Sequence, residues 1–358
     1  MRFTTFLITL AFASNCLAVQ TTGGDRVHSV YFDTSCQMPV LNVSPENEFV
    51  VKTLKWTVGT APEGMQLTTA IALMANQFGL SKTQAADLRN GFGEAYEAMN
   101  TDPQCAELNS ALDEIFATDP ERKGHYFIYV PTNVSADAPT ILFLHGYGGN
   151  LKFYTWALKV AFPNSVVIAP TWGIGWHNGD VAYVDEVCRD AETRFGLSLE
   201  NKWLMGLSAG GPAGFRVMNR KPSDFLGYIC IASGLRPQRV ADVKFTEPIL
   251  MLNGTSDIRF PIHFVRRGVA EMKTNGLFVE HKELDRDHFF LLTDRVATFQ
   301  IIESFIEKHS PVTESLAKID EPHWLVGLLS PWGVACLGLA IVCLVSFSSL
   351  HARRKKLS

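Results

Sequence analysis

Charged residues are scarce in this sequence, and its cysteines are few and scattered. Only 19% of the 358 residues are charged and 47% are apolar, a balance that excludes an intrinsically disordered chain. None of the seven cysteines stands in a CxxC pair, so the cysteines predict no metal site. The sequence has no internal repeat and no low-complexity tract, which excludes a repeat array. What remains is a chain with enough apolar residues for one large domain plus additional segments.

Positive charge is also in short supply in the body of the chain. Without Arg2 and the four cations at 353–356, the sequence has 27 lysines and arginines against 36 aspartates and glutamates, a net charge of −9. Such a balance argues against a nucleic-acid partner.

The N-terminus has the pattern of a cleaved export signal. Arg2 provides the positive start, Phe3–Ala13 is apolar, and small residues suit cleavage after Ala18. A buried N-terminal helix is the alternative, but the run is too short to span a bilayer and stands at the very start. We therefore expect the protein to be exported.

The C-terminus predicts a membrane anchor. Trp324–Leu350 contains no charged residue over 27 positions, more than the roughly 20 that cross a bilayer. Four cations at 353–356 follow, the pattern of a stop-transfer signal with a cytoplasmic tail. The sequence thus predicts a single-pass protein with its body outside the cytoplasm; a sorting tail that is later removed is the alternative.

Four cysteines remain in the expected exported body, and an even number in an oxidising compartment permits disulfides. Cys36 and Cys105 flank a helical region, and we predict a bridge between them. Cys230 falls in a predicted central strand and is expected to be a buried free thiol.

The region 19–120 is expected to be partly irregular and then helical. Ser81–Gln84 has the capping-box pattern, and apolar residues then recur at helical spacing from Leu88 to Met99. Asp102 and Pro103 have the pattern of a second helix start. This region either packs against the main domain, which we favour, or forms a lid over an active site.

From Tyr126 the pattern changes to short β-rich runs that alternate with helical stretches, which predicts an α/β fold with a mainly parallel sheet and helices on both faces. The expected strands are Tyr126–Val130, Thr140–Leu144, Val166–Ala169, Trp203–Met205, Tyr228–Ala232, Ile249–Leu252 and Phe278–Leu284. The expected helices are Ala182–Phe195, one from Ala209, Val265–Asn275 and Ala297–Lys308. The predicted segments are a signal (1–18), an N-terminal region (19–120), a catalytic domain (121–309), a linker (310–323), a membrane helix (324–350) and a basic tail (351–358).

Gly206–Gly210 carries the main chemical signal, a GxSxG sequence between an expected strand and an expected helix. That context is the one a nucleophile elbow requires, and it makes Ser208 the candidate nucleophile. The glycine-rich turn at His145–Gly149 follows another strand, and we propose the backbone N–H groups of Tyr147 and Ala209 as the oxyanion hole. His145 precedes the serine and is expected to be structural.

The partners of the serine follow it in the order acid and then histidine. Asp257 comes directly after the strand Ile249–Leu252 and is the candidate acid, with Asp285 and Asp287 as its rivals. His288 follows the last strand and is the candidate base, because His281 lies inside a strand and His263 opens a helix.

Aromatic residues follow the strand Val166–Ala169, at the sheet edge where loops line active sites. Trp172, Trp176 and His177 lie in that loop, and Phe289 follows the candidate base. These four are the predicted substrate-binding residues, and they favour an aromatic or otherwise apolar acyl group. The alternative is that the two tryptophans only pack the loop against the domain.

The segment from about Gly124 to His309 resembles the esterase/polyhydroxybutyrate-depolymerase-like branch of the α/β-hydrolases, which includes feruloyl-esterase-like members. The resemblance is carried by Leu144–Asn150, Gly179–Val187, Gly206–Gly211, Leu252–Asp257 and Asp287–Phe290. It implies an α/β-hydrolase fold and a serine hydrolase that uses Ser208, Asp257 and His288. No cofactor and no metal are implied.

Three functions remain open on the sequence alone. The first is hydrolysis of carboxylic esters, on a small molecule or a polymer, through an acyl-enzyme. The second is a serine peptidase of the prolyl-oligopeptidase kind. The third is a surface-binding protein without catalytic activity, and the presence of Ser208, Asp257 and His288 argues against it.

Overall fold

The structure is a computed structural model that describes residues 26–41, 71–72, 75, 79–132, 134, 138–149, 151–176 and 180–310. The expected signal, membrane helix and basic tail all lie outside these residues, as does nearly all of the linker. Within the described part of the chain, no helix is long and apolar enough to cross a membrane.

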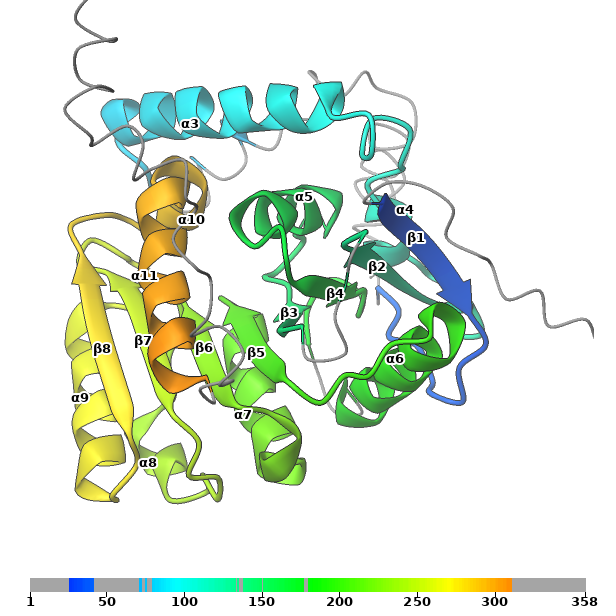
Figure 1. Cartoon of the computed structure of the whole chain (residues 1–358). Coiled ribbons are helices and arrows are strands. Elements are labelled where there is room, and N and C mark those ends of the chain that lie inside the picture. The colour runs from blue at the N-terminus through cyan, green and yellow to red at the C-terminus, as the bar shows by residue number, and fades with distance from the viewer. Residues whose placement is uncertain are drawn as a thin grey trace, which may run out of the picture. The chain divides into compact units, whose positions relative to one another are not determined.

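The described residues form an eight-stranded sheet with the order β1-β2-β4-β3-β5-β6-β7-β8 (Figure 1). Its strands are β1 (Arg26–Phe32), β2 (Gly124–Val130), β3 (Thr140–Leu144), β4 (Val166–Pro170), β5 (Lys202–Leu207), β6 (Gly227–Ile231), β7 (Ile249–Gly254) and β8 (Val279–Leu284). The strand β2 is antiparallel to both of its neighbours, and all pairs from β4 to β8 are parallel. The seven strands expected from the sequence are confirmed within a few residues at their ends.

The strand β3 lies between β4 and β5. The chain runs from β3 to β4 on one side, and the next connection returns from β4 to β5 on the other side of β3. In an open parallel sheet, such a switch point opens a crevice at the carboxyl ends of the strands. The turn after β3 and the turn after β5 therefore meet at one edge, which places Tyr147 beside Ser208.

Helices cover both faces of the sheet (Figure 1). One face carries α3 (Lys82–Thr101), α5 (Leu151–Ala161), α10 (Phe290–Thr293) and α11 (Arg295–His309). The other face carries α6 (Asp180–Phe195), α7 (Gly210–Arg220), α8 (Pro237–Val240) and α9 (Ile262–Thr274). Two short helices complete the description, α4 (Leu112–Ile115) and the 3-10 turn η2 (Pro222–Asp224).

Strand β1 is an element that the sequence analysis did not predict. Val27, Val30 and Phe32 are buried, and the whole strand pairs antiparallel with β2 in the register Arg26 to Val130. It covers the outer edge of β2, so residues 26–32 belong to the same sheet as the strands that precede Ser208, Asp257 and His288.

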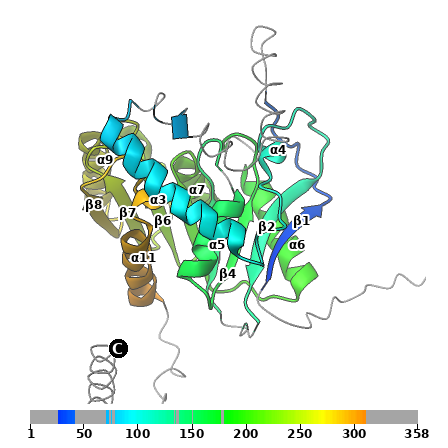
Figure 2. The same ribbon diagram turned by 90° about the horizontal axis from the view of Figure 1, so that it is seen from above.

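Helix α3 begins as predicted at a capping box, because Gln84 N–H donates to Ser81 Oγ and Ser81 N–H donates to Gln84 Oε1. Its apolar stripe packs on α5, where the ring of Phe92 contacts that of Phe153 edge to face at 4.9 Å. Figure 2 shows the helix lying across this face of the molecule. Asp102 is the C-cap of α3, which corrects the expected helix start at Asp102–Pro103. The carboxylate of Asp102 instead accepts the Gln104 N–H and closes a turn.

The predicted bridge between Cys36 and Cys105 is wrong, since both are free thiols. Cys36 packs against the apolar cluster on one face of the sheet, whereas Cys105 is buried in the cluster on the other face. The prediction for Cys230 is confirmed: it is a buried free thiol, and burial raises its pKa to about 12.

Candidate active site

Ser208 stands on a sharp turn between β5 and α7. Its backbone has φ of +49°, a left-handed conformation that a non-glycine residue adopts only where the surroundings enforce it. A Cβ atom on Gly206 would come within 2.5 Å of Gly210 O, and one on Gly210 within 2.2 Å of Leu144 O. Glycine at both flanks is therefore required for the turn to be this tight, and the serine is held at the apex.

Two hydroxyl groups, one from β6 and one from the loop after it, donate hydrogen bonds to backbone carbonyl oxygens of this turn. The Ser233 hydroxyl donates to Ser208 O at 2.7 Å, and the Tyr228 hydroxyl donates to Gly211 O at 2.6 Å. Ser208 N–H in turn donates to Ile231 O at 2.9 Å. The sequence analysis missed Ser233 and Tyr228, and a serine or tyrosine in a buried strand gives no local signal of such a contact.

The structure brings Ser208, His288 and Asp257 into one hydrogen-bonded row. His288 Nε2 lies 3.0 Å from Ser208 Oγ, and His288 Nδ1 lies 2.7 Å from Asp257 Oδ2. With a carboxylate at Nδ1, the neutral ring carries its proton there, so Nε2 can accept the serine proton. Both partners are buried, with 3% of Asp257 and 8% of His288 exposed, which keeps this row out of bulk water.

Asp257 is itself oriented by the backbone that follows it. Its Oδ1 accepts the N–H groups of Arg259 at 2.8 Å and Phe260 at 2.9 Å, which leaves Oδ2 for the imidazole. The ring of Phe260 stacks on His288 with centroids 6.1 Å apart. The carboxylate and the ring are thus both fixed in place before any substrate arrives.

The two rival acids make other contacts. Asp285 Oδ1 accepts the Thr255 hydroxyl at 3.3 Å, and Asp287 Oδ1 accepts the Phe289 N–H at 2.9 Å. In a triad the acid must contact the imidazole at Nδ1. Asp257 makes this contact to His288.

The turn after β3 lies directly against the elbow. A Cβ atom on Gly146 would lie 3.4 Å from Ser208 Cβ, and one on Gly175 would lie 3.5 Å from the Tyr147 ring and 4.0 Å from Ala209 Cβ. Tyr147 and Ala209 therefore flank the same space beside the serine. Among the described residues, neither backbone N–H has a hydrogen-bond acceptor, a requirement for donors that serve an oxyanion.

His145 occupies the interior behind this turn. Its Nδ1–H donates to Gly146 O at 2.7 Å and its Nε2 accepts the Trp172 N–H at 3.2 Å. Complete burial lowers its pKa to about 4, so the ring is neutral at physiological pH. His145 ties the loop after β4 to the turn after β3, in keeping with the structural role expected for it.

The predicted substrate-binding residues are placed as follows. Trp172 is 2% exposed and Trp176 is 6% exposed. Their rings stack with centroids 6.3 Å apart, and both belong to the apolar cluster on the face of the sheet that carries α6 and α7. Trp176 Nε1–H donates to His145 O at 3.0 Å. This burial supports the packing alternative for both tryptophans. Phe289 packs edge to face on His288 at 5.5 Å, and His177 lies outside the described residues.

A small hollow of about 30 Å³ opens beside the imidazole. Its lining residues are Gly79, Leu80, Gln84, Ser256, Ile258, Asp287 and His288. Three of them come from the start of α3 and the turn before it, about 200 residues away from His288 in the sequence. The sequence analysis missed these residues, because nothing local in the sequence connects the cap of α3 with His288.

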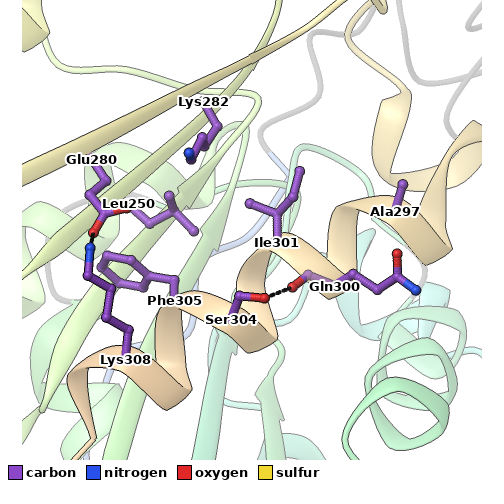
Figure 3. Close-up of a pocket in the computed structure, with 9 residues that line it drawn as sticks. All are labelled: Leu250, Glu280, Lys282, Ala297, Gln300, Ile301, Ser304, Phe305 and Lys308. Atoms are coloured by element: carbon purple, nitrogen blue, oxygen red, sulfur yellow. Dashed lines mark hydrogen bonds and ion pairs between the residues drawn. The ribbon is translucent and has the colours of Figure 1, made fainter.

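A larger hollow, of about 490 Å³, lies away from the serine between β7, β8 and α11 (Figure 3). It contains an ion pair between Lys308 and Glu280 at 2.7 Å, and Phe305 forms part of its apolar wall. None of the triad residues lines it, so its size has no bearing on the chemistry of Ser208. Among the described residues, no cluster of histidine, cysteine or acidic side chains could hold a metal ion.

Comparison with known proteins gives a likeness in structure only. No family model matches the sequence, and no curated protein matches it. Among solved structures, a thermostable esterase is 20% identical over 54% of this chain and 61% of its own, with a TM-score of 0.44. An S-formylglutathione hydrolase from Staphylococcus aureus is 13% identical over 52% of this chain and 94% of its own, with a TM-score of 0.43.

A Pyrococcus horikoshii acylaminoacyl peptidase is 12% identical over 52% of this chain, with a TM-score of 0.43. The chain spans only 40% of that peptidase and 61% of the thermostable esterase. The assignment of an α/β-hydrolase fold therefore rests on the strand order, the antiparallel β2 and the serine at the turn between β5 and α7.

Proposed function

We propose that the protein is a serine hydrolase that cleaves carboxylic esters. The observation that carries this proposal is the row from Ser208 Oγ through His288 to Asp257, at 3.0 Å and 2.7 Å, on a turn with a positive φ. A nucleophile within hydrogen-bond reach of a base, which a third group orients, is the general arrangement for covalent acyl transfer.

The reaction follows from this arrangement. His288 Nε2 takes the proton of Ser208 as the oxygen attacks the ester carbonyl, and Asp257 stabilises the imidazolium that forms. The backbone N–H groups of Tyr147 and Ala209 bind the oxyanion. His288 then protonates the leaving alcohol, and water, activated by the same imidazole, releases the acid from Ser208.

We further propose that the protein belongs to the polyhydroxybutyrate-depolymerase-like branch, a proposal that the motifs at Leu144–Asn150 and Gly179–Val187 support. The substrate is then an ester in a small molecule or a polymer. A peptidase of the prolyl-oligopeptidase kind would use the same residues, and a protein that only binds would use none of their chemistry.

We further propose export by residues 1–18 and anchoring by residues 324–350.

The test is turnover of short-chain p-nitrophenyl esters beside a peptide p-nitroanilide. We expect ester hydrolysis that Ser208→Ala reduces by at least about a thousandfold, because the change deletes only the nucleophile. A fluorophosphonate should label the wild-type protein and not this variant. Ser223→Ala, at an exposed serine in the turn after α7, is the matched control and should behave as wild type.

Two results would overturn the proposal. Amide cleavage that exceeds ester cleavage would make the protein a peptidase. Absence of turnover and of fluorophosphonate labelling in the folded wild-type protein would leave a binding protein on a hydrolase fold.

A further inference from the structure

A buried asparagine at the end of β7 is bonded to the residue that holds the nucleophile turn. Asn253 is fully buried, and its Nδ2–H donates to Ser233 O at 2.7 Å. Because a carbonyl oxygen can only accept, the amide nitrogen and not the amide oxygen of Asn253 must face it. The Ser233 hydroxyl in turn donates to Ser208 O at 2.7 Å. Two hydrogen bonds thus connect the Asn253 side chain with the backbone of the candidate nucleophile.

The same end of β7 leads into the turn of the candidate acid. Asn253 is followed by Gly254, and the Asp257 N–H closes the turn by donating to Gly254 O at 3.3 Å. A Cβ atom on Gly254 would lie 2.4 Å from Arg286 O, so this turn touches the loop that carries His288. The position of the end of β7 therefore bears on both the acid and the base.

The strand β6 separates the strand of the nucleophile from the strand of the acid. Its regular pairing ends at Ile231, which is opposite Leu207 on β5 and Leu252 on β7. The side-chain bonds of Asn253 and Ser233 lie just past that point. They connect the two outer strands through the loop after β6, which itself supplies no member of the triad. Side chains thus continue the connection where the regular strand pairing stops.

We propose that Asn253 is a positioning residue, which through Ser233 fixes the nucleophile turn relative to the turn of the acid. This inference rests on the proposed serine hydrolase function. Asn253 is fully buried and bonds Ser233 rather than the reacting atoms, so its loss should affect turnover and not substrate binding. Misplacement of reacting groups by a fraction of an ångström is enough to lower a rate substantially.

The first experiment is a double-mutant cycle in the full chain, measured as kcat for a p-nitrophenyl ester and as the rate of fluorophosphonate labelling. Asn253→Ala and Ser233→Ala should each lower both rates by about tenfold, with KM unchanged. Because the two side chains act in one row of hydrogen bonds, the double variant should also lose about tenfold and not about a hundredfold. Labelling requires the reactive serine but no ester, so it reports on the nucleophile alone.

The second experiment uses Asn253→Asp, which keeps the shape of the side chain and replaces the amide donor by an acceptor. The introduced carboxyl can donate to Ser233 O only while it is protonated, and burial raises the pKa of a carboxyl. The ratio of variant to wild-type kcat/KM should therefore fall by about tenfold from about pH 6 to about pH 9. Burial raises the pKa of Cys230, beside Ser233, to about 12 and that of Tyr228 well above its ordinary value, so neither group titrates in this range. The triad groups are common to both proteins and cancel in the ratio.

Thr140→Val is the matched control, because Thr140 is as buried as Asn253 but begins β3, whose other end meets the elbow. It should leave kcat, the labelling rate and the pH ratio at wild-type values.

Two results would overturn the inference. The first is an additive double variant, with a loss of about a hundredfold. The second is a ratio for Asn253→Asp that stays constant with pH while circular dichroism shows the variant folded, and this second measurement decides alone should Asn253→Ala fail to fold. Wild-type protein that neither cleaves esters nor takes the fluorophosphonate is a different outcome, which overturns the proposed function itself.

Discussion

The candidate nucleophile has a strained backbone conformation that hydrogen bonds from neighbouring residues hold in place. Ser208 and Ala232 both have positive φ, at +49° and +47°, and each such conformation costs about 1–3 kcal/mol. The two strained residues face each other across β5 and β6, where Ser208 N–H donates to Ile231 O. Ser233, next in the chain, returns a hydrogen bond to Ser208 O, so the elbow depends on the residues that follow β6.

Ser233 is therefore expected to act as a positioning residue. Ser233→Ala removes a hydrogen bond that contributes about 1 kcal/mol to stability. It also leaves the backbone carbonyl of Ser208 without this donor, so the serine is positioned less firmly. We expect kcat to fall by about tenfold with KM unchanged, together with slower fluorophosphonate labelling. Ser165→Ala removes a buried serine elsewhere and should change neither rate. Equal labelling rates for Ser233→Ala and wild type would contradict the assignment.

The residues of the candidate site differ in how far the sequence reveals them. Ser208, Asp257 and His288 could be predicted because each follows a strand and their order along the chain is informative. Ser233 and Tyr228 could not, because each makes its contact with residues distant in the sequence. The bridge between Cys36 and Cys105 failed for a related reason: chain spacing does not tell which face of a sheet a residue packs against.

Among the elements, the β1–β2 ribbon is joined to the rest of the sheet through a buried histidine. His125 on β2 bonds the Ser29 hydroxyl on β1 at 2.8 Å and the Thr171 hydroxyl after β4 at 2.9 Å. Burial, and then the charge of Arg122, lower the pKa of His125 to about 3. The ring is therefore neutral in the fold, and each hydroxyl can serve as donor or acceptor to the ring nitrogen that it faces.

This burial predicts acid sensitivity of the fold. The unfolded chain binds a proton at His125 near pH 6.5 and the folded chain does not, so stability is complete above pH 6.5 and falls as the pH drops toward 3. The slope from this one group is about 1.4 kcal/mol per pH unit. Urea unfolding between pH 7 and pH 4 measures it. His125→Asn should show a shallower loss, and parallel curves for variant and wild type would refute the expectation.

The elements themselves were largely predictable, but the strand β1 and the helices α5, α8 and α10 were not predicted. The strands β3 to β7 are continuous apolar runs, as strands covered on both faces must be. The strand β1 has buried residues at Val27, Val30 and Phe32 without strict alternation, and it is an edge strand that pairs with β2 almost a hundred residues onward. Local pattern does not reveal such a pairing. The short α8 and α10 were also missed, since four residues give too little periodicity.

At the scale of the whole molecule, the chain divides between His309 and Ser310. A chain that ends at Ser310 is therefore expected to keep the ester kcat/KM of the full chain. Only the full chain should remain with membranes after a carbonate wash, because 324–350 is the proposed anchor. Leu337→Arg places a charge in mid-span at a cost of about 3 kcal/mol and should weaken retention. A truncated chain that stays with the membrane would disprove the anchor.

Helix α3 has a consequence for the order in which this protein folds during its synthesis. The backbone of Gly91 packs against that of Thr293 in α10, so one partner leaves the ribosome about 200 residues before the other. Until translation passes α10, the apolar stripe of α3 lacks part of its cover, and such exposed stripes are where nascent chains bind chaperones or aggregate. The face of α3 that α10 covers is thus completed only after nearly all of the described residues have been synthesised.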